Sequence, residues 1–183
     1  MTATPTTSEI VNHLIRERWQ QAFVLPTYAP DGWWECDVLE ITKAGYWHEY
    51  EVKVSRADFL RDAAKKRRDS WKYEGGVRID LPGARKHDLL AAGSTKGPSR
   101  FTYVAPAGLL ALADVPEWAG LMEATRMPGR FGGPDRIGIR TAKAAPRIHG
   151  EKFGDRRTRA MELTCYYRFH RAGHEEFEDR EGI

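Results

Sequence analysis

Cysteine is scarce in this sequence, and long apolar runs are absent from it. The 183 residues include two cysteines, Cys36 and Cys165, which lie far apart and outside any CxxC spacing. This argues against a disulfide framework and against a cysteine-based zinc site, so we expect both to be reduced packing residues. No stretch approaches the roughly 18 to 20 consecutive apolar residues of a membrane-spanning helix, and the N-terminus lacks the pattern of a secretion signal. We therefore expect a cytoplasmic protein with no membrane partner.

The composition is that of a folded chain with unevenly distributed charge. Apolar residues make up 41% and charged residues 30%, which excludes disorder of the whole chain. The formal net charge is +3, but the segment 173–183 is strongly acidic. We predict a single domain over residues 1–172 and a flexible acidic tail over 173–183. The basic body is compatible with a polyanionic partner.

The first half of the chain predicts a helix followed by a hairpin. Ser8 is a candidate cap for a helix whose apolar residues recur at helical spacing. The segment Leu25–Gly32 contains two prolines and an Asp-Gly pair, so we expect a turn-rich connection. Residues 33–41 and 46–54 are rich in aromatic and β-branched side chains and are predicted to form an antiparallel hairpin.

The second half predicts further strands and a closing helix. We expect a helix over 56–71 capped by Ser55, and irregular structure over 73–100 with one short helix near 87–92. Strands are expected at 101–106, 120–125 and 136–140, a glycine-rich loop at 127–135, and a final helix from Asp155. Together these elements indicate an α/β domain with a central mixed sheet.

Three charged residues on the predicted hairpin form the most informative chemical pattern. Side chains alternate along a strand, so Glu51 and Lys53 share one face. If Asp37 lies on that face too, two carboxylates and an ammonium meet at one end of the hairpin. This set suits Mg²⁺-dependent phosphodiester hydrolysis, because carboxylates bind the metal and the lysine stabilises the anionic transition state. Taken alone, Glu-x-Lys spacing is also explained by cross-strand ion pairs that face water.

The order of these residues resembles the PD-(D/E)XK nuclease superfamily. Its signature is an acidic residue on one strand and Glu-x-Lys on the next, after a helix that often adds a glutamate. The helix bearing Glu9, then Asp37, then Glu51-Val52-Lys53 follow that order. The segment EVKVSRADFLRDAAKKRRDSWKY, 51–73, is similar to the MmcB-like DNA-repair group and to related phage-encoded nucleases, as are FTYVAPAGLL and VPEWAGLMEA further on. The resemblance covers 8–124; Cys36 stands where the superfamily pattern has proline.

This resemblance implies a restriction-endonuclease-like core, with a central mixed β-sheet flanked by helices, and a Mg²⁺-dependent deoxyribonuclease. Asp37 and Glu51 are the implied metal ligands, Mn²⁺ is expected to substitute for Mg²⁺, and Lys53 is expected to orient the attacking water. Glu9 is a third candidate ligand. A glutamate favoured by the helix dipole in the first turn explains Glu9 equally well.

Other carboxylates on the same elements compete for these roles. Glu17 lies on the first helix and is better explained as an exposed helical residue. Glu35 and Glu49 belong to the candidate face of the hairpin, and we interpret both as surface charges. His48 is expected to face away from Glu51, and most of the six tryptophans are expected in the core.

DNA is the expected partner. Basic residues on or after the second predicted helix are candidate phosphate contacts, which predicts salt-sensitive binding with little sequence preference; they are Arg56, Arg61, Lys65, Lys66, Arg67, Arg68 and Lys72. A solvated helix face is the alternative explanation. A second basic group, for which that alternative is stronger, comprises Arg140, Lys143, Arg147, Lys152, Arg156, Arg157 and Arg159.

The sequence thus favours a nuclease of DNA repair, recombination or phage genome processing, in a bacterial cell or a phage-infected host. The alternative function is a non-catalytic nucleic-acid-binding protein that retains the fold. Clustered carboxylates favour the enzyme, because a pure binder has little reason to place them beside a polyanion. Cleavage of duplexes and junctions often requires two active sites, which is a reason to consider a homodimer, although no self-complementary surface can be read from the sequence.

Overall fold

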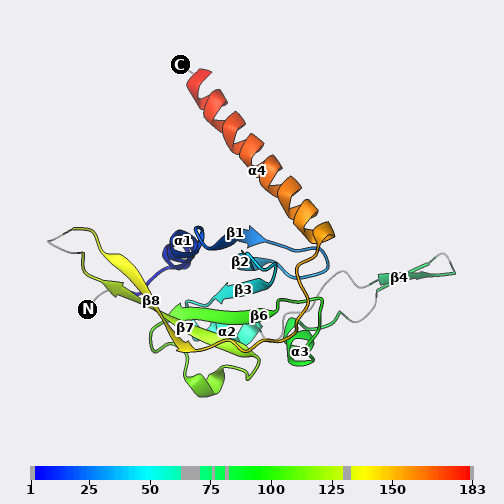
Figure 1. The fold of residues 1–183 in the computed structure, drawn as a ribbon, viewed down its shortest axis with the longest axis horizontal. Helices are drawn as coiled ribbons and strands as arrows, with labels where there is room; N and C mark the ends of the chain where they lie inside the picture. The colour runs from blue at the N-terminus through cyan, green and yellow to red at the C-terminus, as the bar shows by residue number, and fades with distance from the viewer. Residues whose placement is uncertain (1–2, 63–70, 76, 81–82, 130–132, 182–183) are drawn as a thin grey trace.

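A six-stranded mixed sheet lies at the centre of the structure, a computed structural model that describes residues 3–62, 71–75, 77–80, 83–129 and 133–181 (Figure 1). The elements in chain order are α1 (Thr7–Arg18), β1 (Ala22–Tyr28), β2 (Cys36–Thr42), β3 (Trp47–Val52), α2 (Arg56–Asp62), β4 (Trp71–Glu74), β5 (Val77–Asp80), α3 (Lys86–Ala91), β6 (Arg100–Pro106), the 3₁₀ helix η1 (Leu112–Asp114), β7 (Ala119–Met127), β8 (Arg136–Lys143) and α4 (Asp155–Glu181). The predicted α/β class with a central mixed sheet flanked by helices is confirmed.

The strand order of the central sheet is β1-β2-β3-β6-β7-β8. The first three strands are antiparallel, β6 is parallel to β3 and to β7, and β8 is antiparallel to β7. The turn between β2 and β3 is tight and uses Gly45 with φ +84°, a conformation that glycine adopts without strain. The step from β3 to the parallel β6 needs a crossover, and this part of the chain carries α2 and α3.

Each face of the sheet packs against different helices. Val38, Tyr50 and Val52 face α1 and form a cluster with its buried Ile10 and Leu14. The opposite face is larger and more aromatic; Trp47, Phe101 and Tyr103 of the strands pack there with Phe59 of α2 and Leu90 of α3. Because side chains alternate, Glu49 and Glu51 project toward this second face, beneath α2 and α3.

The cap of helix α1 lies two residues before the predicted one. The N-cap is Thr6, whose side chain accepts from the backbone of Glu9 while the Glu9 carboxylate accepts from the backbone of Thr6. This reciprocal pair is a capping box, and it satisfies two backbone N–H groups that the helix leaves without partners. Ser8 therefore lies inside the helix.

Three predictions for the connecting segments are wrong. Residues 25–32 were expected to be a turn-rich connection, but Ala22–Tyr28 forms β1, an edge strand paired with β2. Proline is tolerated on an edge strand because its missing N–H can face away from the ladder, which explains Pro26. Trp71, expected in the second helix, begins β4, which pairs with β5 in a separate two-stranded sheet. Part of the segment 73–100, predicted to be irregular, therefore forms strands, because the two segments pair with each other. The part of the expected helix over 63–70 lies outside the described residues.

The remaining strands and the last helix agree with the sequence. The predicted strands at 101–106, 120–125 and 136–140 correspond to β6, β7 and β8, and the short helix near residue 87 is α3. Helix α4 starts at Asp155 as expected and continues through Glu181, so the backbone of the acidic segment is helical as far as Glu181. The predicted flexibility of that segment stays a prediction. Within the described ranges, no helix combines the length and apolar character needed to cross a membrane.

Candidate functional site

The candidate site lies where β3 ends and the chain enters α2. In the register of β2 and β3, Leu39 is opposite Glu49 and Val38 is opposite Tyr50. By alternation, Asp37 therefore shares the face of Glu49 and Glu51, as the sequence pattern required. Lys53 continues the ladder beyond β3, because its backbone N–H donates to the carbonyl of Val104 on β6 at 2.9 Å.

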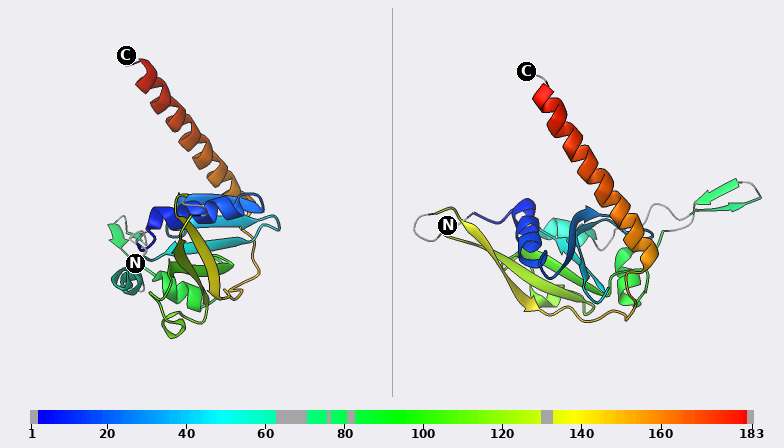
Figure 2. Two further views of the ribbon diagram at one scale, coloured as in Figure 1. Left: turned by 90° about the vertical axis from the view of Figure 1, so that its left-hand side faces the viewer. Right: turned by 45° about the horizontal axis from the view of Figure 1, so that its top comes forward.

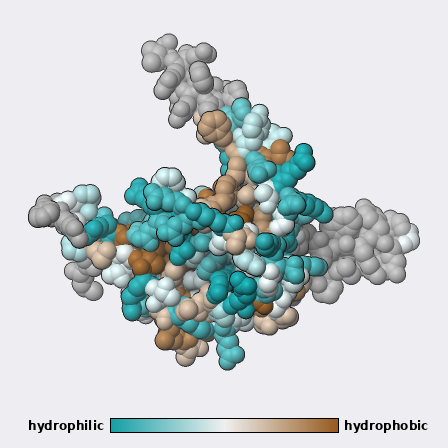
Figure 3. All heavy atoms as spheres, viewed as in Figure 1, coloured by the Kyte–Doolittle hydropathy of each residue, from teal (hydrophilic) through white to brown (hydrophobic). Residues whose placement is uncertain are grey.

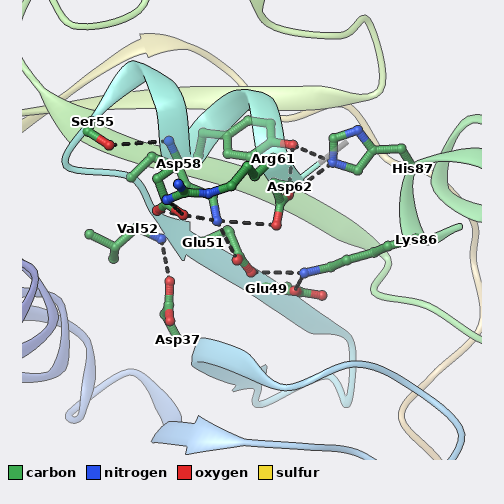
Figure 4. A network of polar contacts seen from close by, with 12 residues as sticks. Asp37, Glu49, Glu51, Val52, Ser55, Asp58, Arg61, Asp62, Lys86 and His87 are labelled. Atoms are coloured by element: carbon green, nitrogen blue, oxygen red, sulfur yellow. Dashed lines mark hydrogen bonds and ion pairs between the residues drawn. The ribbon is translucent and has the colours of Figure 1, made fainter. Parts of the chain in front are cut away.

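Glu51 accepts hydrogen bonds from two lysines. Lys53 Nζ donates to Oε1 at 2.8 Å, and Lys86 Nζ donates to Oε2 at 2.8 Å. Lys86 comes from the first turn of α3 and reaches the sheet from the side opposite Asp37 in Figure 4. All three side chains are buried; Lys86 has no exposed surface. Both oxygens of the Glu51 carboxylate are thus engaged by cations.

Glu49 is part of this cluster, which corrects its interpretation as a surface charge. Its Oε1 lies 2.5 Å from Lys86 Nζ, and its Oε2 accepts a hydrogen bond of 2.7 Å from Trp33 Nε1. The carboxylate is completely buried because α3 and Trp33 cover this part of the sheet. Glu35, by contrast, is exposed as expected, and so is Glu17 on α1.

Lys53 has a second carboxylate partner besides Glu51, namely Asp62 at the end of α2. Asp62 Oδ1 accepts from Lys53 Nζ at 3.2 Å, and Oδ2 lies 3.0 Å from His87 Nε2. The hydroxyl of Tyr103 lies 2.8 Å from the same His87 nitrogen. Asp58, one turn earlier on α2, is 3.8 Å from Lys53 Nζ. Ser55 Oγ accepts from the backbone N–H of Asp58 at 3.2 Å, which confirms the predicted cap of this helix (Figure 4).

The electrostatics of the cluster follow from burial and from alternating charges. Burial raises the pKa of Glu49 to about 7, against the opposing effect of Lys86. Burial also disfavours the charged form of Glu51, but Lys86 and Lys53 outweigh it, so the pKa of Glu51 is lowered. For Lys86, burial is outweighed by Glu49, Glu51 and Asp62, which raise its pKa well above the usual value. Lys86 therefore carries a full charge in the protein interior.

Asp37 lies apart from this chain of ion pairs. Its Oδ2 accepts a hydrogen bond of 2.7 Å from the backbone N–H of Val52, and Figure 4 shows the carboxylate pointing to that nitrogen. Partial burial raises the pKa of Asp37, and the negative charge of Glu51 raises it further. Two carboxylates that repel each other at the end of a hairpin form an environment that a cation stabilises.

The described contacts of Glu9 are with Thr6 and Arg126, and neither residue belongs to the cluster of Asp37 and Glu51. Its two oxygens lie 2.6 Å from Arg126 Nη2, and the hydrogen bonds from Thr6 and Arg126 lower the pKa of Glu9 to about 2. It lines a cavity of about 260 Å³ with other residues of α1 and with residues 135–137 at the start of β8, and α1 covers the opposite face of the sheet from Glu51. Among the residues that the structure describes, no group of three or more His, Cys, Asp or Glu side chains suits a metal ion.

The predicted DNA-contacting residues are only partly described. Arg56 is bound by both oxygens of Asp114, at 2.7 and 2.8 Å, so its charge is locally neutralised. Arg61 is 75% exposed and lies 3.6 Å from Asp58. Lys65, Lys66, Arg67 and Arg68 lie outside the described residues, and for Lys72 only the backbone in β4 is described. Of the second basic group, Arg157 lies over Trp47 and Arg140 pairs with Glu123.

The expectations for His48 and the tryptophans are largely confirmed. His48 lies on the α1 face, where it bonds Thr102 and stacks on Tyr50, away from Glu51. Trp33, Trp34 and Trp47 are buried and Trp118 packs partly buried against the same core, whereas Trp19 is 62% exposed; the Trp71 side chain is not among those described.

Sequence reasoning missed Lys86, His87, Asp62 and Tyr103. Asp62 was detectable, because it lies four residues after Asp58 on the same predicted helix and four-residue spacing shares a helical face. Lys86 gave no such signal. It stands between Arg85 and His87 in a polar run that is typical of an exposed segment.

Comparison with solved structures supports the fold. The chain is similar to SPO1766, a protein of unknown function from Silicibacter pomeroyi, with a TM-score of 0.55 and 16% sequence identity. The match covers 100% of this chain and 97% of that chain. At this identity the similarity shows a shared fold. No family model matches the chain, and neither does any curated protein.

Proposed function

We propose that this protein is a metal-dependent deoxyribonuclease of the PD-(D/E)XK type that its sequence resembles. One observation carries the proposal: Asp37 and Glu51 lie on the same face of neighbouring strands, and Lys53 donates a hydrogen bond to Glu51 at the end of the hairpin. The order of helix, acidic strand, Glu-x-Lys strand and following helix also agrees with the resemblance. DNA repair, recombination and phage genome processing are the proposed settings.

Asp37 and Glu51 would hold the metal. Mg²⁺ is commonly bound in proteins by one or two carboxylates, with water and substrate phosphates completing its shell, so a pair of carboxylates is a fitting donor set. Asp37 fits best, because it is half-buried and its charged form is destabilised by the neighbouring Glu51. Each oxygen of Glu51 accepts one lysine hydrogen bond, and its second lone pair would remain for the metal. When bound, Mg²⁺ or Mn²⁺ lowers the pKa of a coordinated water and neutralises charge on the phosphate.

The remaining residues position these groups. Lys53 is the proposed catalytic cation: it would stabilise negative charge that develops on the phosphate, and Asp62 is its second carboxylate partner besides Glu51. Lys86 fixes the second oxygen of Glu51, and Glu49 in turn holds Lys86. His87 and Tyr103 orient Asp62. A buried, fully paired network of this kind keeps its groups in one arrangement.

A second candidate function is binding of nucleic acid without catalysis. It is favoured by the engagement of both Glu51 oxygens by lysines, an arrangement that pairs this carboxylate without a metal. On this alternative the network only stabilises the fold, and exposed arginines such as Arg61 make the phosphate contacts.

Cleavage of labelled linear, flapped and four-way-junction DNA in Mg²⁺ or Mn²⁺ tests the proposal. Asp37→Asn is the central variant, because an asparagine oxygen can still accept from the Val52 N–H while the charge is lost. Glu35→Gln is the matched control, since Glu35 is an exposed carboxylate two residues away. Circular dichroism and thermal unfolding establish that both variants are folded.

The nuclease predicts metal-dependent cutting that falls by about 100-fold or more in Asp37→Asn and is unchanged in Glu35→Gln. Salt-sensitive binding to DNA without any cutting supports the second candidate instead. A protein that does not bind DNA and does not cut it contradicts both functions.

A further inference from the structure

Helix α4 leaves the body of the protein after its first turns. Met161 is buried in the aromatic core, and Arg168 donates to the backbone carbonyls of Pro26 and Thr27 on β1. Beyond these contacts the helix projects away from the sheet in every view (Figures 1 and 2). Its 27 residues correspond to a rod of about 40 Å.

The side of α4 that faces away from the body is apolar and aromatic. Leu163, Tyr166 and Tyr167 are 51%, 57% and 67% exposed, and they are separated by three and four residues, which places them on one helical face. His170 continues this face, with its ring centroid 4.2 Å from that of Tyr166. The buried Met161 lies on the opposite side. Apolar residues are visible among hydrophilic ones on the described part of α4 in Figure 3.

The sequence of α4 is divided into two halves of opposite charge. From Asp155 to Arg171 it has five arginines against two acidic residues, a formal net charge of +3. From Ala172 to Glu181 it has five acidic residues against one arginine, a net charge of −4. Two such helices side by side attract each other when they run antiparallel, because each basic half then lies beside an acidic half. In a parallel pair, like charges meet along the whole length.

We propose that α4 is a dimerisation helix, whose aromatic face (Leu163, Tyr166, Tyr167 and His170) binds the α4 of a second copy of this chain in antiparallel orientation. A helix draws most of its stability from packing of an apolar face, and only the first turns of α4 pack on their own body. A second copy covers the exposed aromatic residues and satisfies the charge pattern at once. This assembly is independent of the nuclease proposal and of any bound metal.

Sedimentation of the full chain over a range of concentrations tests the assembly. The wild type is expected to dimerise, and Leu163→Glu with Tyr167→Glu is expected to raise the dimer dissociation constant about tenfold or more, because charges enter the apolar contact. Both positions are exposed, so the fold of the body is retained, which circular dichroism checks. Leu112→Glu is the matched control: Leu112 is 57% exposed but lies in η1, and its substitution is expected to leave the dimer unchanged.

The orientation is tested by a distance between two spin labels. A label at the exposed Arg159→Cys, in a chain with Cys165→Ser and the buried Cys36 retained, lies within about 15 Å of its copy in a parallel pair. In an antiparallel pair centred on the aromatic face, the two labels are separated by about 22 Å along the helix axes. Raising the salt concentration is expected to weaken the antiparallel dimer, because the two charged halves are screened from each other.

Three results overturn the proposal. The first is a wild-type chain that stays monomeric up to about 100 µM, which leaves no self-association of useful strength. The second is a dimer that the Leu163→Glu and Tyr167→Glu substitutions do not weaken, since the contact then lies elsewhere. The third is a distance below about 15 Å between labels at position 159, which indicates a parallel pair.

Discussion

Lys86 and Glu51 are joined by a hydrogen bond of 2.8 Å, although 35 residues separate them in the sequence and the lysine has no exposed surface. The glutamate of the Glu-x-Lys pattern is therefore held by a second lysine that the pattern does not contain. Lys86 also lies 2.5 Å from Glu49 and packs over the ring of Phe101. This one ammonium compensates two buried carboxylates.

Replacement of Lys86 by methionine is expected to destabilise the protein by about 3 to 5 kcal/mol, since it breaks a buried ion pair and leaves Glu49 and Glu51 with too few partners. Unfolding in urea measures this loss. Lys96→Met is the matched control, because the Lys96 side chain is exposed, and it should change stability by less than about 0.5 kcal/mol. A loss below about 1 kcal/mol for Lys86→Met contradicts the described network.

The pH dependence of stability should report on Asp62. His87, Lys86 and Lys53 outweigh the burial of Asp62 and lower its pKa below the usual value. A carboxyl with a lowered folded-state pKa stabilises the protein above its unfolded pKa of about 4, and this contribution is lost as the pH falls further. We expect Asp62→Asn to be less stable than wild type at pH 7, and the two curves to converge as the pH drops below about 4. Urea unfolding of both proteins across this pH range measures the two stabilities. A stability difference that stays constant at all pH values contradicts the prediction.

Substitution of Glu9 separates its two interpretations. Glu9→Gln is expected to lower the melting temperature, because it weakens the capping box and the pairing with Arg126. The rate of DNA cleavage, measured below the melting temperature, should stay within about threefold of wild type, since the contacts of Glu9 are with Thr6 and Arg126. Loss of cutting with an intact fold indicates instead that Glu9 is a metal ligand.

Two arginines on α2 should contribute unequally to DNA binding. Arg61→Ala is expected to lower the slope of log K against log salt by about 0.9, the loss of one phosphate contact. Arg56→Ala should have a smaller effect, because Asp114 already neutralises the Arg56 guanidinium. Fluorescence anisotropy with labelled DNA at several salt concentrations measures both slopes. Equal losses, or a larger one for Arg56, contradict this assignment.

The sequence predicted the elements that carry strong local patterns. Aromatic and β-branched residues alternate along β2 and β3, and these strands pair as expected. Strand β1 was not predicted, because Pro26 interrupts the strand pattern in the sequence. Its backbone is also irregular at Thr27, where φ is +47°. Only pairing with β2 along an edge makes that segment a strand.

For the site, local spacing placed Asp37, Glu51 and Lys53 on one face but gave no information on burial. Glu49 looked like a surface charge because its neighbours in sequence include His48 and Glu51. It is buried because α3, which follows more than thirty residues later, covers it with Lys86. Partners brought together by the tertiary fold leave no periodic signal in the sequence.

The central claim concerns Lys53, and the single-turnover rate of DNA cleavage in Mg²⁺ by Lys53→Met tests it most directly. Lys53 is buried between Glu51 and Asp62, so its loss should remove the proposed charge stabilisation at the phosphate and leave the exposed arginines proposed to bind DNA intact. The prediction is a rate reduced by about 100-fold or more at saturating DNA, with DNA affinity within about threefold of wild type. A folded Lys53→Met protein that cleaves DNA at the wild-type rate contradicts the proposed active site, and a wild-type protein that does not cleave contradicts the proposed nuclease.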